Sequence, residues 1–148
     1  MIRIKRVYEP PSPEDGRRVL VDRLWPRGVR RQGSRIDSWR PDLAPSHELR
    51  QWFGHRVARF PRFRERYRME LLRHHEALVQ LAVETDRGPV TLLFAAKDPE
   101  HSNAAVLCEL LEEVTLTRGV GEVVSAPRAG EQETRPRPAK SRPNRRRA

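Results

Sequence analysis

The continuous apolar run at residues 90–96 is the feature that most constrains how this chain can fold. Val90-Thr91-Leu92-Leu93-Phe94-Ala95-Ala96 contains no charged residue that would mark a solvent-facing side. A continuous run of this kind is typical of a strand covered on both faces, as in a parallel sheet flanked by helices. It therefore predicts a central strand of such a sheet, with Leu93 and Phe94 both buried.

Two more strands are predicted upstream of this run. Residues 2–8 alternate apolar with basic side chains, as expected for a half-exposed strand. Arg18 to Leu24 is predicted as a second strand that ends in polar residues. The long loop that follows contains Pro26, Gly28 and Gly33, and we expect Ile36, Trp39 and Leu43 to attach it to the core. These sheet-forming segments lie between stretches with helical spacing.

Three helices are predicted around the sheet. Ser46 is a plausible N-cap of a short helix that Gly54 can end. Apolar residues at steps of three and four from Phe60 to Leu81 predict one longer helix, with His74 packed in the core. A last helix is expected to begin near Pro99, with Asp98 as its N-cap.

Length and charge indicate one folded domain followed by a basic tail. The chain has 148 residues, 36% apolar and 34% charged, so a single domain with a modest core is expected. Residues 117–148 hold nine Lys or Arg and three Glu, a net charge of +6 out of +10. They also contain four prolines and no aromatic residue, which predicts a disordered basic tail. The sequence thus predicts a small single-domain α/β fold over residues 1–116 with Rossmann-like layering, and a tail over 117–148.

Polar and charged side chains follow two of the predicted strands directly. Asp22 and Arg23 follow the second strand, and Lys97 and Asp98 follow the third. Ligands of open α/β sheets bind outside the carboxyl ends of parallel strands, and paired arginines favour an anion with several oxygens. The candidate ligand-binding residues are Arg23, Trp25, Arg27, Arg50, Asp98 and Asn103, and the candidate catalytic residues for proton transfer are Asp22, Lys97 and His101.

Several of these residues have a structural alternative. Asp22 and Lys97 can each form an ion pair that only holds a loop, and Trp25 can be a core or lid side chain. No metal is expected, because the histidines lack the spacing of metal ligands. The single cysteine, Cys108, excludes an intramolecular disulfide and is expected to be inert.

A series of short motifs supports a family resemblance over residues 1–116. They are Lys5-Arg6-Val7-Tyr8, Val21-Asp22-Arg23-Leu24-Trp25-Pro26-Arg27-Gly28, Ala44-Pro45-Ser46-His47-Glu48-Leu49-Arg50-Gln51-Trp52-Phe53, Phe63-Arg64-Glu65-Arg66-Tyr67, Glu70-Leu71, Thr91-Leu92-Leu93-Phe94-Ala95-Ala96-Lys97-Asp98, His101, Asn103-Ala104 and Val106-Leu107. In this order the motifs resemble the YeaO-like branch of the family called domain of unknown function 488. Ser102 departs from the family pattern, in which another Asn or His is common. The resemblance implies a bacterial cytoplasmic α/β protein and supplies no established reaction.

Three classes of function are compatible with the sequence. The first is a small enzyme acting on a phosphorylated or nucleotide ligand held in an anion-binding crevice. The second is a nucleic-acid-associated protein that uses the basic tail 117–148, and the third is a stress accessory protein without catalysis. No cofactor is predicted, since no glycine-rich cofactor loop is present. A membrane role is not expected either, because no stretch approaches the roughly 18 apolar residues that a span requires.

Overall fold

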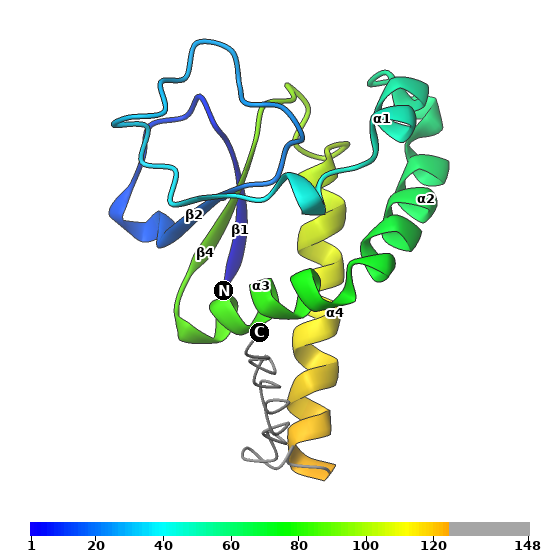
Figure 1. The fold of residues 1–148 in the computed structure, drawn as a ribbon. Coiled ribbons are helices and arrows are strands. Elements are labelled where there is room, and N and C mark those ends of the chain that lie inside the picture. The colour runs from blue at the N-terminus through cyan, green and yellow to red at the C-terminus, as the bar shows by residue number, and fades with distance from the viewer. Residues whose placement is uncertain (125–148) are drawn as a thin grey trace, which may run out of the picture.

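The computed structural model describes residues 1–124, with side chains described as far as Arg118. The strands are β1 (Ile2–Arg6), β2 (Arg17–Leu20), β3 (Ser38–Trp39) and β4 (Val90–Phe94). The helices are α1 (His47–Phe53), α2 (Phe60–Arg73), α3 (His75–Arg87) and α4 (Asn103–Val124). The predicted α/β class is confirmed, and Figure 1 shows how these elements are arranged.

All strands of the sheet are parallel, in the order β1-β4-β2-β3. The predicted central strand is confirmed: Leu92 of β4 lies opposite Ile4 of β1 on one side and Val19 of β2 on the other. Leu93 and Phe94 are fully buried, as expected from the continuous apolar run. Since all strands run the same way, their carboxyl ends meet at one edge of the sheet.

The two faces of the sheet are covered differently. On one face, Val19, Leu92 and Phe94 pack in the main core with side chains of the helices, and α4 contacts both β1 and β4. On the other face, Leu20 and Leu93 pack against loop side chains that include Trp25, Val29, Ile36 and Trp39. The long loop after β2 therefore covers this face of the sheet, as the apolar residues in it led us to expect.

The predicted single helix from Phe60 onwards is two helices. His74 separates α2 from α3 with backbone angles of φ −103° and ψ 44°. Leu71 and Leu78 are both buried on either side of the break, so the apolar spacing continues through the bend and cannot reveal it. The prediction of a core histidine is wrong, because His74 occupies the bend and is exposed.

The C-terminal helix extends beyond the predicted domain limit. We expected the tail to begin at Thr117, but α4 continues to Val124. Residues 125–148 lie outside the described part of the chain, so the expected disorder of the tail concerns residues that the structure does not describe. Along the described residues, no helix combines the length and the apolar character needed to cross a membrane.

Candidate functional site

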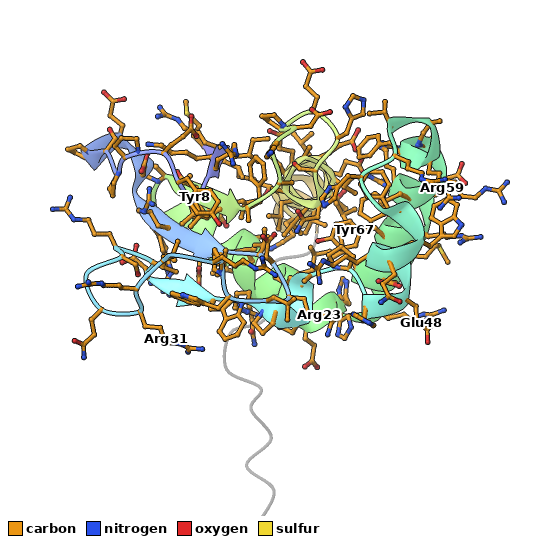
Figure 2. The ribbon with its side chains drawn as sticks, turned by 90° about the horizontal axis from the view of Figure 1, so that it is seen from above. Tyr8, Arg23, Arg31, Glu48, Arg59 and Tyr67 are labelled. Carbon is orange, nitrogen blue, oxygen red and sulfur yellow. The ribbon has the colours of Figure 1, made fainter. Side chains whose placement is uncertain are left out.

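A pocket of about 610 Å³ opens at the carboxyl edge of the sheet. We call it the edge pocket. Figure 2 views the molecule from above this edge and labels Tyr8 and Arg23, which both line the pocket. The pocket wall contains every candidate site residue named from the sequence: Asp22, Arg23, Trp25, Arg27, Arg50, Lys97, Asp98, His101 and Asn103. The predicted juxtaposition of the two strand ends is thus observed, while the chemical role of each residue remains a prediction.

Asp22 is held firmly at the junction of β2, β4 and α4. Its Oδ2 accepts a hydrogen bond from the backbone N–H of Ala95 at 2.9 Å, and its Oδ1 accepts one from Asn103 Nδ2 at 3.1 Å. The same Asn103 amide donates to the carbonyl oxygen of Val21 at 3.0 Å. Burial raises the pKa of the Asp22 carboxyl above its ordinary value, although the hydrogen bonds from Ala95 and Asn103 act in the opposite direction. Asp22 thus has a structural role, but through hydrogen bonds to Ala95 and Asn103 and not through the ion pair that was considered.

Asp98 and His101 form a pair on the pocket wall. Asp98 Oδ2 lies 2.6 Å from His101 Nδ1, and this hydrogen bond lowers the pKa of the Asp98 carboxyl. The His101 ring also meets Phe60 edge-on, with ring centroids 5.0 Å apart. His101 therefore has one partner in its own turn, Asp98, and one at the start of α2, Phe60.

The predicted N-cap of the last helix is wrong. α4 begins at Asn103, and the hydroxyl of the buried Ser102 accepts a hydrogen bond from the Ala105 N–H at 3.1 Å. Asp98 instead accepts from the Glu100 N–H at 3.1 Å, in the turn that precedes the helix. Both Asp98 and Ser102 are residue types that stabilise turns and helix starts, so composition alone could not separate them.

The cations of the edge pocket differ in how they are engaged. Arg23 Nε donates to the carbonyl oxygen of Pro45 at 3.0 Å and so attaches the loop after β2 to the segment before α1. The side chains of Arg27, Arg50 and Lys97 are exposed and make no hydrogen bond or salt bridge to any described residue. Three cationic groups thus face one pocket without a hydrogen bond or salt bridge to a described residue, although the charge of Arg50 also lowers the pKa of the Asp22 carboxyl.

Aromatic side chains complete the pocket wall, and most of them were not named as site residues. Phe53 and Phe63 line it and stack on each other with centroids 4.3 Å apart. Both are buried core residues that also form pocket wall. Tyr8 and His55 line the pocket as well. Tyr8 follows β1, so the rule about strand ends could have found it, whereas no sequence signal singled out His55.

Trp25 packs as a core side chain and also lines the edge pocket, while its part in ligand binding remains a prediction. Its indole Nε1 donates to the Val29 carbonyl at 2.7 Å, and its ring meets Trp39 edge-on at 5.6 Å. The Arg31 guanidinium lies 4.9 Å from the Trp25 ring centroid. Trp25 therefore packs into the loop layer and also contributes to the edge pocket.

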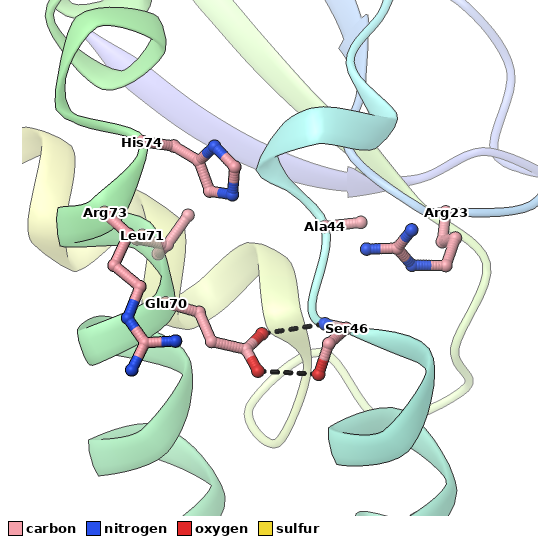
Figure 3. A pocket seen from close by; sticks show the side chains of 7 residues that line it. All are labelled: Arg23, Ala44, Ser46, Glu70, Leu71, Arg73 and His74. Carbon is pink, nitrogen blue, oxygen red and sulfur yellow. Dashed lines mark hydrogen bonds between the residues drawn. The ribbon is translucent and has the colours of Figure 1, made fainter.

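A smaller pocket of about 170 Å³ lies on the other side of Arg23 (Figure 3). Glu70 crosses it to the start of α1, where it accepts from the Ser46 N–H at 2.7 Å and from the Ser46 hydroxyl at 2.6 Å. Ser46 Oγ in turn accepts from the Leu49 N–H, which confirms the predicted N-cap. Glu70 thus fixes α2 to α1, a contact that the sequence did not reveal.

A metal centre has no obvious place among the residues that the structure describes. Their histidine, cysteine and acidic side chains form no cluster of three or more that could hold an ion. Burial and nearby glutamates raise the pKa of Cys108 to about 11, which disfavours a reactive thiolate.

Comparisons with known proteins place the chain among uncharacterised relatives. A family model described as the inactive DUF488-N3 subclade matches residues 1–129. The uncharacterized protein Rv3073c of Mycobacterium tuberculosis (strain ATCC 25618 / H37Rv) is 46% identical over 110 residues, which are 74% of this chain and 92% of that protein. The uncharacterized protein YeaO of Escherichia coli (strain K12) is 42% identical over 110 residues, covering 74% of this chain and 96% of that protein. No solved structure shows a significant match.

Proposed function

The chain belongs to the DUF488 family, in a subclade described as inactive, and from this premise we propose that it binds a small phosphate-type anion in the edge pocket without transforming it. The observation that carries the proposal is the set of three exposed cations, Arg27, Arg50 and Lys97, around one pocket. Guanidinium groups bind phosphate oxygens through paired hydrogen bonds, and an ammonium group adds a point charge.

The charge balance of the pocket supports an anion. The wall carries four cationic side chains, because Arg23 joins the three named above, against the carboxylates of Asp22 and Asp98. Both carboxylates already accept hydrogen bonds from the protein. Four cationic groups against two carboxylates leave an excess of positive charge, which attracts a ligand with negative charge.

The apolar part of the wall favours a ligand that also has an organic portion. Trp25, Pro26, Phe53 and Phe63 line the same pocket as the cations. Its volume of about 610 Å³ is within the range of small-molecule sites. A nucleotide offers a flat apolar base and a phosphate in one molecule, and so matches both parts of the wall.

The engagement of Asp22, one of the three candidate catalytic residues, supports binding without turnover. A general base must reach the proton that it removes, yet both oxygens of Asp22 are committed to Ala95 and Asn103. A small enzyme acting on a phosphorylated or nucleotide ligand is the second candidate. The observation favouring it is the Asp98–His101 pair, because a carboxylate commonly orients a catalytic histidine.

Isothermal titration calorimetry with inorganic phosphate, adenosine, AMP and ADP tests the proposal. We expect AMP or ADP to bind more tightly than adenosine, and Arg27→Gln and Arg50→Gln to weaken nucleotide binding on the order of 10- to 100-fold, since charged hydrogen bonds contribute about 1.5–3 kcal/mol. Arg30→Gln is the matched control, because Arg30 is an exposed arginine of the same loop that does not line the pocket.

Two outcomes would contradict the proposal. If Arg27→Gln, Arg50→Gln and Arg30→Gln all bind like the wild type, the pocket cations are not ligands. If chromatography of the incubated nucleotide shows turnover that His101→Asn abolishes, the protein is an enzyme and the second candidate replaces the first.

A further inference from the structure

The arginines of α2 fall into two groups on different sides of the helix. Arg64 and Arg68 face α4, where Arg64 forms hydrogen-bonded salt bridges with Glu109 at 2.7 and 2.8 Å. Arg68 Nη2 lies 2.6 Å from Glu113 Oε2. This side of α2 is neutralised by the acidic residues of α4, so its arginines hold two helices together.

The second group has no such partners. Arg66 lies four residues after Arg62, and Arg73 lies seven residues (two turns) after Arg66, so the three lie along one stripe of the helix. Arg59 in the turn before α2 extends the stripe, and we call these four residues the arginine row. The side chains of Arg62, Arg66 and Arg73 are exposed and make no hydrogen bond or salt bridge to any residue whose side chain is described. Of the two acidic residues of α2, Glu70 is held by Ser46, and the exposed Glu65 acts on Arg64 of the other group.

Trp52 holds two members of the arginine row close together. The guanidinium carbons of Arg59 and Arg66 lie 5.2 and 4.7 Å from the centroid of the Trp52 ring. Arg59 also donates to the Trp52 carbonyl oxygen. Cation–π contact keeps these like charges in place, but it does not neutralise them. An external anion with several charges is therefore the natural partner of this surface.

We propose that the arginine row binds the phosphodiester backbone of duplex nucleic acid. From Arg62 to Arg73 the row extends ~16 Å along α2, at 1.5 Å per residue, which is about the rise of five base pairs. The Trp52 ring already carries two guanidinium groups, so it is not free to stack on an unpaired base, and this favours a duplex over a single strand.

This surface is separate from the edge pocket. Figure 2 shows Arg59 at the α1–α2 side of the molecule, and Tyr8, which lines the pocket, at the other side. No member of the row lines the edge pocket. The inference therefore does not depend on the proposed function, and either can fail alone.

Fluorescence anisotropy tests the proposal. A labelled 20-base-pair DNA duplex of mixed sequence is titrated with the full chain over a range of salt concentrations. Each phosphate contact contributes roughly 0.9 to the slope of log affinity against log salt. Arg62→Gln combined with Arg66→Gln should lower the slope by about 1.8 and weaken binding on the order of tenfold or more at 0.1 M salt. The charge-retaining Arg62→Lys with Arg66→Lys should keep the wild-type slope.

The matched control is Arg30→Gln combined with Arg35→Gln, which removes the same charge from exposed arginines of the loop after β2. We expect this pair to leave the slope nearly unchanged. Equal losses in the two glutamine pairs would show that only net charge matters and would overturn the proposal. An unchanged slope in the variant with Arg62→Gln and Arg66→Gln would overturn it as well. The proposal would also be wrong if the full chain binds the corresponding single strand more tightly than the duplex and these two substitutions remove that difference.

Discussion

The side chain of Asp22 and the backbone amide of Ala95 join the carboxyl ends of β2 and β4, with 2.9 Å between Asp22 Oδ2 and the Ala95 nitrogen. Parallel strands diverge where they leave the sheet, and this hydrogen bond keeps the two loops together at that point. Asn103 extends the link to the start of α4. The residue that the sequence offered as a proton-transfer group is thus a structural link on which the edge pocket is built.

Asp22→Ala should lower the free energy of unfolding by about 1–3 kcal/mol, because it leaves the Ala95 N–H and the Asn103 amide without their acceptor. Urea denaturation at pH 7 measures this loss. Asp86→Ala is the control, since Asp86 forms only an exposed salt bridge with Arg118, and surface pairs contribute about 0–1 kcal/mol. Similar, small losses in both variants would show that Asp22 does not hold the strand ends together.

A second prediction concerns the buried charges around Asp15. Asp15 and Arg18 are almost fully buried, and Asp15 also accepts from Lys5 Nζ at 3.2 and 3.3 Å and from the Ser12 N–H at 3.0 Å. Burial alone would raise the pKa of Asp15, but the hydrogen bonds from Ser12, Lys5 and Arg18 lower it below its model-peptide value of 3.8. Because the pKa is lower in the folded state, the stabilisation from this group is present above about pH 4 and is lost as the pH falls through the folded pKa.

Asp15→Asn should therefore cost about 3–5 kcal/mol at pH 7, since it leaves the buried Arg18 and the half-buried Lys5 without their carboxylate. The difference between wild type and variant should shrink as the pH is lowered from 5 towards 2. Urea denaturation across this range measures it. A difference that stays constant with pH would mean that Asp15 titrates alike in the folded and unfolded states.

A third prediction concerns two glycines that both have a positive φ. Gly16 has φ +61°, and a Cβ built there would lie 2.1 Å from the Pro89 carbonyl oxygen. Gly28 has φ +76°, with no atom within 4 Å of the corresponding position. Gly28→Ala should cost about 1–2 kcal/mol for the left-handed backbone alone. Gly16→Ala should cost clearly more in thermal and urea unfolding, because the residue before β2 must also move away from Pro89. Equal costs would show that the close approach to Pro89 is unimportant.

The last prediction concerns the basic C-terminal segment, which we propose contributes to nucleic-acid binding. Residues 125–148 carry eight Lys or Arg and two Glu, and their only nonpolar side chains besides proline are alanines. Their removal should weaken duplex DNA binding and reduce the salt slope, while the thermal midpoint stays nearly unchanged because no large apolar side chain is lost. Anisotropy and thermal denaturation measure the two effects. If the shortened chain binds duplex DNA as tightly as the full chain, the segment has no such role.

The sequence predicted the sheet and the position of the site because both depend on simple patterns. The unbroken apolar run of β4 required two covered faces, and the parallel arrangement then brought Arg23 and Lys97 to one pocket. The bend at His74 could not be predicted, since the apolar steps continue through it. The engagement of Asp22 by Ala95 and Asn103, and the contrast between the neutralised and the unpaired arginines of α2, depend on distant segments whose contacts leave no local signal.

The strand order also determines when this sheet can form during synthesis. β1 pairs with β4, and β2 has β4 as its longest neighbour, whereas β2 and β3 share only two paired positions. After residue 20 the ribosome must add about 70 residues before β4 exists, which takes roughly 4–14 s at 5–20 residues per second. During those seconds Ile2 and Ile4 of β1 have no partner strand, and Val19 and Leu20 of β2 can pair only with the two residues of β3. The newly made N-terminal segment is therefore the part of this protein that a holding chaperone would meet first.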